Sequence, residues 1–330
     1  MKAVLLIGHG GPECLQFHRD VPVPTPAPGE VLLKVGAAAI NNTDINVRVG
    51  WYSKTVSSAT DAAVAAASAA GEPVDGGWDG SSFRFPRIQG IDACGRIVAV
   101  GEGVESARIG QRVLVDPVIR PAGRGPNEVE YLGAERDGAF AEYVAVPAAN
   151  AHVIVSACSD VELASLPCAA GTAGHLIERA GVRAEDTVLV TGASGGVGSA
   201  AVQLAAARGA RVIGIAQAAK HEQVRALGAF RALDREADIG PELGAESVDV
   251  VVDVVGGAAF PSLLQVLRRG GRYAVAGAIG GPCVELDLRT LYLKDLTVLG
   301  CTVPPPGLFG RIVSAIEAGV LRPVVSAVYP

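Results

Sequence analysis

The pattern of apolar and polar residues changes about half-way along the chain. Before residue 155, short apolar runs are separated by turns rich in glycine, proline and aspartate. Short strands with frequent turns are typical of a barrel-like β domain. The strands are predicted at residues 2–7, 31–38, 97–100, 112–115 and 140–146. The proline-rich residues 21–29 exclude a helix or a central strand and predict an extended loop.

After residue 156, apolar strands alternate with helical patterns. Helices are predicted at residues 160–166, 174–180 (after a break at Pro167), 199–208, 221–227 and 258–267. Strands are predicted at residues 187–191, 210–216, 248–254 and 272–278. This alternation predicts an α/β domain, a doubly wound parallel sheet with helices on both faces. We expect it to extend from about residue 156 to about residue 302.

One stretch of this second half has the pattern of a nucleotide-binding turn. Residues 187–191 form an apolar, β-branched run, residues 192–198 contain four glycines, and an alanine-rich helix follows. A strand, a glycine turn and a helix N-terminus in this order bind a pyrophosphate, because free N–H groups and the helix dipole favour an anion. Side chains would block its close approach. The alternating strands and helices supply the context that a glycine pattern alone lacks.

The same turn contains a competing motif. Residues 192–196 satisfy G-x-S-x-G around Ser194, the pattern of a hydrolase nucleophile. A triad in the usual order would then need an acid followed by a histidine, but His221 is the only histidine beyond Ser194 and it directly follows the second strand. We therefore favour a dinucleotide site. The turn residues predicted to bind the cofactor are Ser194, Gly195, Gly196 and Val197.

The end of the second strand indicates which dinucleotide binds. NAD sites usually place an acid there for the ribose 2′-hydroxyl. This strand instead ends at Ala216, with Lys220 shortly after it. A lysine suits a 2′-phosphate, which an acid would repel, so we predict NADPH with Ala216 and Lys220 in its site; an ordinary solvated lysine remains the alternative for Lys220. The other cofactor-binding residues are predicted at Thr172, Val255, Gly277 and Ala278.

Composition narrows the class of protein. A length of 330 residues favours two domains, and 49% hydrophobic with 19% charged residues indicates a globular chain. The net charge of −6 with no basic block argues against a nucleic-acid partner. No apolar run is long enough for a membrane span. The six scattered cysteines lack a C-x-x-C pair, which favours a cytoplasmic protein with reduced thiols.

With these motifs in view, the chain resembles the medium-chain dehydrogenase/reductase superfamily, most closely its zinc-free quinone oxidoreductase and enoyl reductase branch. The resemblance extends over almost the whole chain and is carried, beside the glycine turn, by residues 28–34, 40–45, 50–52, 138–144, 249–253 and 270–273. It implies a GroES-like catalytic domain at 1–155 and a Rossmann NADP-binding domain at 156–302. Residues 303–330 would return to the catalytic domain in a shortened form.

The resemblance also implies that no metal is bound. Catalytic zinc needs three protein ligands. Where zinc members have a cysteine this chain has Asn41, and where they have a histidine–acid pair it has Ile91 and Asp92, so only Cys168 remains. Residues 116–136 contain no cysteine for a structural zinc lobe. We expect Cys168 to be a small buried residue.

In place of zinc, the resemblance implies two polar catalytic residues. Tyr52 is predicted to donate a hydrogen bond or a proton to the developing enolate, with a half-buried loop tyrosine as the alternative. Asn41 is predicted to lie beside the nicotinamide, and Asp44 to accept hydrogen bonds as a local turn or cap residue. The implied activity is NADPH-dependent reduction of an activated C=C bond or a quinone in a small-molecule substrate. A zinc-free alcohol/carbonyl oxidoreductase and a non-catalytic NADPH-binding protein remain alternatives.

Two further segments carry expectations. Residues 53–85 read as an insertion that is helical or flexible, for which a surface excursion is favoured over a lid. Residues 295–301 match an edge strand through which relatives pair. An exposed apolar edge needs covering, so a homodimer is predicted.

Overall fold

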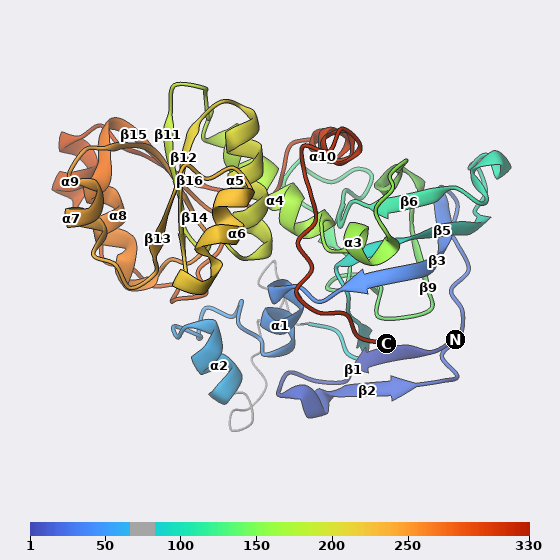
Figure 1. The fold of residues 1–330 in the computed structure, drawn as a ribbon. Coiled ribbons are helices and arrows are strands. Elements are labelled where there is room, and N and C mark those ends of the chain that lie inside the picture. Colours follow the sequence, from blue (N-terminus) through green and yellow to red (C-terminus); the bar gives the residue numbers. More distant parts are fainter. Residues whose placement is uncertain (67–82) are drawn as a thin grey trace.

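The structure is a computed structural model that describes residues 1–66 and 83–330. Figure 1 shows an antiparallel β lobe, built mainly from the first half of the chain, beside a lobe in which helices cover both faces of a central parallel sheet. The predicted α/β fold class, a GroES-like β domain plus a Rossmann sheet, is confirmed.

The β lobe is organised around a five-stranded antiparallel sheet in the order β10-β6-β5-β3-β9. A three-stranded sheet, β2-β1-β4, and a β7-β8 pair complete it. Alternate residues of β9 are buried, as expected for strands with one face on the core. The bounds are β1 (Ala3–Leu6), β2 (Leu15–His18), β3 (Glu30–Ala39), β4 (Arg87–Ile88), β5 (Asp92–Val100), β6 (Arg112–Val115), β7 (Val118–Ile119), β8 (Glu130–Tyr131), β9 (Tyr143–Pro147) and β10 (Ala151–Val153).

The second lobe contains a six-stranded, entirely parallel sheet in the order β13-β12-β11-β14-β15-β16. The strand order reverses between β11 and β14, which places a ligand crevice at their carboxyl ends. Both strands are almost continuously buried, as a sheet covered on both faces requires. The bounds are β11 (Thr187–Val190), β12 (Arg211–Ala216), β13 (Arg231–Asp234), β14 (Val248–Asp253), β15 (Leu267–Val275) and β16 (Thr297–Gly300).

The helices follow the predicted alternation with different bounds. The α-helices are α1 (Asn42–Arg48), α2 (Thr60–Ala66), α3 (Asp160–Ala164), α4 (Pro167–Arg179), α5 (Gly196–Ala207), α6 (His221–Ala226), α7 (Ile239–Leu243), α8 (Phe260–Val266), α9 (Leu288–Leu293) and α10 (Leu308–Glu317). Short 3-10 turns occur at η1 (Pro12–Cys14), η2 (Ser106–Arg108), η3 (Ala148–Asn150), η4 (Ala218–Lys220) and η5 (Gly257–Ala259). The predicted helix at 174–180 in fact begins at Pro167, because proline fits the first helical position.

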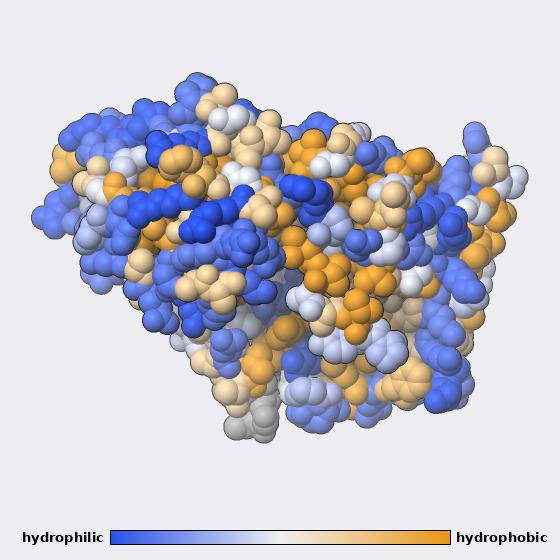
Figure 2. Space-filling view, viewed as in Figure 1, coloured by the Kyte–Doolittle hydropathy of each residue, from blue (hydrophilic) through white to orange (hydrophobic). Residues whose placement is uncertain are grey.

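Helix α10 contacts both lobes: it packs against α4, its Phe309 ring lies against His152, and Glu317 accepts a hydrogen bond of 2.8 Å from Val155 N. The helix buries one apolar stripe, and a Cβ on Gly174 of α4 would lie 2.9 Å from Ile312 Cδ1, so the two helices are in close contact. Beyond it, Gln203 of α5 and the backbone of Arg322 exchange hydrogen bonds of 3.1 and 2.9 Å. On the face in Figure 2, apolar side chains gather around this region, whereas the outer surface of the Rossmann lobe is mostly hydrophilic.

Two general expectations can be compared with the structure. All six cysteines are free thiols, as predicted. Among residues 1–66 and 83–330, no helix has the length and apolar character needed to cross a bilayer.

Candidate active site

A pocket of about 770 Å³ lies where the two lobes meet. One wall comes from α1 with the turn after it and from β7 and β8; the other comes from α4, α5 and the loops after β14, β15 and β16. Six predicted site residues line it: Asn41, Tyr52, Thr172, Val197, Gly277 and Ala278. The other six, Ser194, Gly195, Gly196, Ala216, Lys220 and Val255, lie outside this lining.

The glycine turn forms the N-terminus of α5, a helix of 12 residues that begins after Gly195. Gly192 has a φ of 56°, which favours glycine, and a Cβ on Gly198 would lie 2.1 Å from Gly192 O. Gly198 is therefore needed for the contact between helix and strand, whereas Gly195 would place its Cβ 3.4 Å from the same oxygen. The open glycine turn at a helix N-terminus fits a pyrophosphate.

The predicted cofactor-binding residues Ala216 and Lys220 lie at the end of β12 and just after it. Ala216 ends the strand, and its carbonyl accepts a hydrogen bond of 3.1 Å from Arg235 N. Lys220 ends the η4 turn and is exposed. The structure thus places both predicted residues at the carboxyl edge of the sheet, away from the central pocket.

Val255 belongs to a turn that a buried aspartate fixes. Asp253 is fully buried and accepts hydrogen bonds from Thr191 Oγ1 (2.5 Å), Val255 N (2.8 Å), Gly256 N (3.1 Å) and the Tyr273 hydroxyl. The carbonyl of Val255 accepts from Gly280 N at 2.7 Å. The two loops that follow β14 and β15 are therefore tied together beside the pocket.

On the opposite wall, Asn41 is the N-cap of α1. Its Oδ1 accepts from Thr43 N at 3.0 Å, and Asp44 Oδ2 accepts from Asn41 N at 2.9 Å. Asp44 Oδ1 also accepts from the backbone N–H groups of Gly90 and Ile91, so its predicted role as a cap acceptor is confirmed. Burial raises the pKa of Asp44 to about 6, against the effect of these hydrogen bonds.

A second buried carboxylate fixes Asn41 from the other side. Asp92 is 1% exposed; its Oδ2 accepts from Asn41 Nδ2 at 3.2 Å and its Oδ1 from Cys168 N at 2.6 Å. Burial raises the pKa of Asp92 to about 7, with Asp44 adding to the rise. The amide of Asn41 is therefore held at both ends, and Asp92 ties the first turn of α1 to the first turn of α4.

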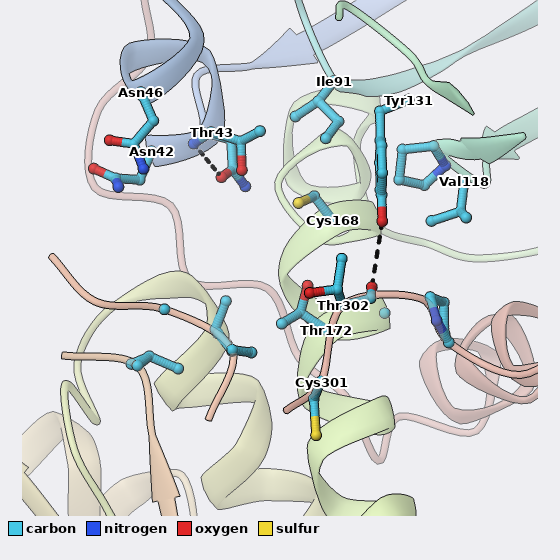
Figure 3. A pocket seen from close by; sticks show the side chains of 18 of the residues that line it. Asn42, Thr43, Asn46, Ile91, Val118, Tyr131, Cys168, Thr172, Cys301 and Thr302 are labelled. Atoms are coloured by element: carbon cyan, nitrogen blue, oxygen red, sulfur yellow. Dashed lines mark hydrogen bonds between the residues drawn. The ribbon is translucent and has the colours of Figure 1, made fainter. Parts of the chain in front are cut away.

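Tyr52 lies in the same wall, near the polar side chains of Thr43 and Asn46, which act to lower its pKa. Burial raises the pKa of the Tyr52 phenol well above its usual range, so the hydroxyl keeps its proton at neutral pH. Figure 3 shows Thr43 and Asn46 together on α1, across the pocket from Thr172. A protonated phenol in this position can donate to a carbonyl oxygen on which charge develops.

Cys168 lines the pocket, and Figure 3 shows it between Thr43 and Thr172. Burial raises the pKa of this thiol well above its usual value, and the carboxylates of Asp92 and Asp44 raise it further. A thiol in this environment is a weak nucleophile, which suits a packing residue.

The residues at the zinc-ligand positions do not fit zinc. Asn41 offers an amide, and both oxygens of Asp92 already accept hydrogen bonds, so Cys168 is the one usual zinc ligand among the three. Zinc sites in proteins use thiolate, imidazole and free carboxylate oxygens. Across the described ranges 1–66 and 83–330, no three histidine, cysteine or acidic side chains are grouped as a metal would require.

Several pocket residues were not predicted from the sequence. Tyr131 is 5% exposed and donates its hydroxyl to Thr302 O at 3.4 Å (Figure 3). Trp51, Lys54 and Asp116 also line the pocket. Tyr131 comes from β8, a strand of two residues that is too short to show a periodic pattern, so the neighbouring sequence gives no signal that it lines a pocket. Trp51 stands beside Tyr52 in the 50–52 motif, which is the one signal that could have indicated it.

The described part of the insertion, residues 53–66 and 83–85, is partly exposed and partly in contact with the pocket walls. Thr60 N donates to Ile279 O at 3.0 Å, and Trp51 Nε1 donates to Ser58 O at 3.0 Å. Thr60 and Ala63 are buried. These contacts join the insertion to both walls of the pocket; the predicted segment at 67–82 lies outside the described residues.

Comparison with known proteins agrees with this geometry. Residues 27–156 match the model for the alcohol dehydrogenase GroES-like domain, and residues 196–317 match the model for zinc-binding dehydrogenases. The chain is 30% identical to acryloyl-coenzyme A reductase of Metallosphaera sedula, over 99% of this chain and 92% of that protein. The chain belongs to the medium-chain dehydrogenase/reductase superfamily.

Other members of the superfamily show the same full-length similarity. The quinone oxidoreductase of Lama guanicoe is 28% identical over 100% of this chain and 90% of its own length. A crystal structure of a candidate alcohol dehydrogenase from Sinorhizobium meliloti 1021 superposes with a TM-score of 0.88 at 47% identity, covering 98% of this chain and 88% of that one. This member of the superfamily is therefore a nicotinamide-dependent oxidoreductase acting on a small molecule.

Proposed function

We propose that this chain is an NADPH-dependent, zinc-independent reductase of an activated C=C bond, in an α,β-unsaturated carbonyl or enoyl thioester, or of a quinone. The observation that carries the proposal is the position of Tyr52, which lines the pocket beside Thr43 and Asn46, opposite the wall that carries Thr172 and Gly277. The relatives named quinone oxidoreductase and acryloyl-coenzyme A reductase support both substrate classes.

In this proposal the catalytic part is residues 1–155 with 303–330, and the cofactor part is residues 156–302. The pyrophosphate would bind at Ser194–Val197, the adenosine phosphate near Ala216 and Lys220, and the nicotinamide half beside Thr172 and residues 277–278. Bound there, the nicotinamide would supply a hydride to the β carbon of the substrate. Two features of the chain fit a nicotinamide dinucleotide. The glycine turn opens α5, and the pocket extends from the first turn of α5 to Tyr52.

The chain's own residues would stabilise the charge that hydride addition creates. Tyr52 donates a hydrogen bond, then a proton, to the substrate carbonyl oxygen as that oxygen becomes negative. Asn41 cannot rotate, because Thr43 N and Asp92 hold both ends of its amide. Its second Nδ2 hydrogen is therefore presented in a fixed direction, toward either the nicotinamide amide or the substrate. Burial of the pocket strengthens both interactions.

Oxidation of NADPH in the presence of small enones, an enoyl thioester and quinones tests the proposal. The wild-type protein should turn over at least one class, and Tyr52→Phe should lower kcat for enones about 100-fold, since it removes the acid. The matched control is Tyr329→Phe, whose ring is 74% exposed and which should leave kcat unchanged. Cofactor binding without turnover of any class would contradict the proposal and favour a non-catalytic NADPH-binding protein.

A second function is favoured by the solved structures named alcohol dehydrogenase. Under this alternative the same Tyr52 hydroxyl would donate to an aldehyde or ketone oxygen, again without zinc. Turnover of saturated carbonyl compounds in preference to enones and quinones, undiminished by a chelator, would select it. A stoichiometric zinc ion required for activity would contradict both functions, because Asn41, Asp92 and Cys168 do not form a zinc site.

We also propose a homodimer through residues 295–301. β16 forms one edge of the parallel sheet, and Val298 is 44% exposed on it, beside exposed Tyr292 and Leu293. An apolar edge strand of this kind is stabilised by pairing with a second copy. In sedimentation experiments the wild-type protein should be a dimer and Val298→Asp a monomer. A monomeric wild-type protein would contradict the proposed homodimer. A cytoplasmic location is part of the same proposal, supported by the six free thiols.

A further inference from the structure

One carboxylate in the pocket has no part in the proposed hydride transfer. Among the lining residues in the described ranges, Asp116 is the only acid, and it lies between β6 and β7. This side of the pocket is largely apolar: Ile91, Val118 and Tyr131 belong to one buried cluster, and Figure 3 shows them together, away from Asn46. A charge in such surroundings is costly unless a polar partner meets it, so a suitable group on a bound substrate would stabilise the complex.

The backbone around Asp116 is held by Asn150. Asp116 N donates to Asn150 O at 2.8 Å, and Asn150 Nδ2 donates to Asp116 O and to Val118 O, both at 2.9 Å. Asn150 is 8% exposed, so these bonds are largely shielded from water. The carboxylate therefore projects from a fixed turn, and its direction is set before any substrate binds.

The two carboxylate oxygens of Asp116 have different surroundings. Oδ1 accepts from Val118 N at 3.0 Å, which closes the turn. Oδ2 accepts no hydrogen bond from any residue within 1–66 and 83–330, and it is not one of the enclosed, unpartnered polar atoms of these residues. Oδ2 is therefore accessible. Since Asp116 lines the pocket, it is the oxygen that a bound substrate can reach.

The guanidinium of Arg120 lies nearby but bonds to other groups. Its Nη atoms donate to Val118 O and to Pro304 O, although its charge favours the ionised form of Asp116. None of the ion pairs within residues 1–66 and 83–330 includes Asp116. Burial raises the pKa of Asp116 to about 6, so the carboxylate is mostly ionised at neutral pH. Its negative charge thus remains for a substrate.

We propose that Asp116 determines the substrate specificity of this pocket: its Oδ2 accepts a hydrogen bond from a donor on the substrate, an ammonium group above all, and disfavours a substrate that carries a carboxylate there. The inference rests on the proposed function for the reacting group of the substrate. The donor would lie on the part of the substrate that packs against Val118 and Tyr131. A site built to bond a polar group rejects an analogue without it, because its own polar atom is then left unpaired.

The kinetic test uses benzalacetone, an enone, with an aminomethyl, a methyl or a carboxylate group at the para position. Asp116→Asn keeps Oδ1 for the bond from Val118 N and replaces Oδ2 by a donor. It should lower kcat/KM about tenfold for the ammonium form, leave the methyl form unchanged and raise kcat/KM about tenfold for the carboxylate form. Comparing each substrate between wild type and variant cancels its intrinsic reactivity and the contribution of Lys54, which also lines the pocket. A uniform change across the three forms would overturn the proposal.

The matched control is Asp238→Asn. Asp238 also accepts from the backbone N–H two residues further on, Gly240 N at 3.3 Å, but it is exposed and outside the pocket lining. This variant should leave all three kcat/KM values unchanged; the same reversal of preference in it would show that position in the pocket is not what matters. Asp116→Ser, whose hydroxyl can replace Oδ1 in the turn, is the second variant if the asparagine protein does not fold, and it should lose the same preference.

Binding of the saturated analogues, the para-substituted benzylacetones, does not depend on turnover. With the oxidised cofactor present, calorimetry on the wild type should give a Kd about tenfold lower for the ammonium form than for the methyl form. Asp116→Asn should abolish this preference. If the wild type reduces neither enones nor quinones, the proposed function fails, whereas these Kd values still decide the role of Asp116. Equal wild-type affinity for the three forms, or no binding of the ammonium form, overturns it.

Discussion

The two walls of the pocket are held together in different ways. The cofactor wall is the one formed by α4, α5 and the loops after β14, β15 and β16, and the substrate wall is the one formed by α1, the turn after it, β7 and β8. On the cofactor wall the glycine turn depends on a local contact, between Gly192 and Gly198, which are six positions apart in sequence. On the substrate wall the decisive hydrogen bonds join residues 51 and 76 positions apart, Asn41 with Asp92 and Cys168 with Asp92. A binding surface that recurs in many proteins can be built from one short segment. A surface that selects one reaction is assembled from several distant segments.

Each wall also contains a buried aspartate, and the two have different numbers of donors. Asp253 on the cofactor wall accepts from Thr191, from Tyr273 and from two backbone N–H groups. Asp92 on the substrate wall accepts from one side chain and one backbone N–H, and burial raises its pKa to about 7. The cofactor wall is therefore the more rigid support, and the substrate wall carries carboxyl groups that titrate near neutral pH.

The largest effect should come from the helix–strand contact of the cofactor wall. In Gly198→Ala the new methyl group would overlap the Gly192 carbonyl, so we expect a loss of about 3 kcal/mol in the free energy of unfolding. Gly195→Ala has room for its methyl group and should fold, yet bind NADPH at least about tenfold more weakly because the phosphates approach there. Chemical denaturation and NADPH titration measure the two effects.

The control for this pair is Gly310→Ala in α10, where an added Cβ meets nothing within 4 Å. It should leave NADPH affinity unchanged and raise stability slightly, as alanine favours a helix. If Gly198→Ala were as stable as Gly310→Ala, the close contact between α5 and β11 would not be a structural requirement. The cofactor wall would then be less local than the comparison holds.

A buried tyrosine on each wall gives the next largest effect. Tyr273→Phe removes a donor from the fully buried Asp253, so it should cost about 2 kcal/mol in the free energy of unfolding. Tyr131→Phe removes a long hydrogen bond of 3.4 Å to Thr302 O and should cost less than about 1 kcal/mol. Tyr131→Phe should instead raise the KM for the substrate, since Tyr131 lines the pocket. If Tyr273→Phe and Tyr131→Phe lowered the free energy of unfolding equally, the inference that the cofactor wall is the more rigid one would be wrong.

The glycine turn and the strand–helix alternation could be predicted from the sequence, because each depends on residues that are neighbours along the chain. Strand β13 was missed: it is four residues long and is defined by pairing with β12. Thr43, Asn46 and Tyr131 could not be assigned, since their roles arise from side chains that meet only in the folded chain.

Titration of the substrate wall should change stability with pH. Burial raises the pKa of Asp116 to about 6 in the folded protein, against the effects of the Val118 N–H and of Arg120. Between the unfolded value of about 4 and this folded value, only the folded state holds the proton. Stability must therefore fall as pH rises from about 4 to about 6, and the fall is complete above that range.

Asp116→Asn removes this contribution, so its free energy of unfolding should drop by about 1 to 2 kcal/mol less than that of the wild type over the same pH range. Urea denaturation at several pH values measures the slope. Asp44 and Asp92 still titrate in the variant and give a remaining slope of the same sign. If the free energy of unfolding of the variant depended on pH as that of the wild type does, ionisation of Asp116 would not be what destabilises the protein.

The smallest effect is expected at the exposed end of the cofactor wall. Lys220→Ala should weaken NADPH binding about threefold to tenfold and leave NADH binding unchanged, because only NADPH carries the 2′-phosphate. Lys220 is exposed, so the effect should shrink as salt is added.

The matched control is Lys2→Ala, which changes an exposed lysine of the β lobe and should alter neither the NADPH nor the NADH affinity. Equal weakening of both cofactors would remove Lys220 as the selective residue. Since Arg235 N bonds to Ala216 O beside it, Arg235→Ala would then be the next variant to separate the two dinucleotides.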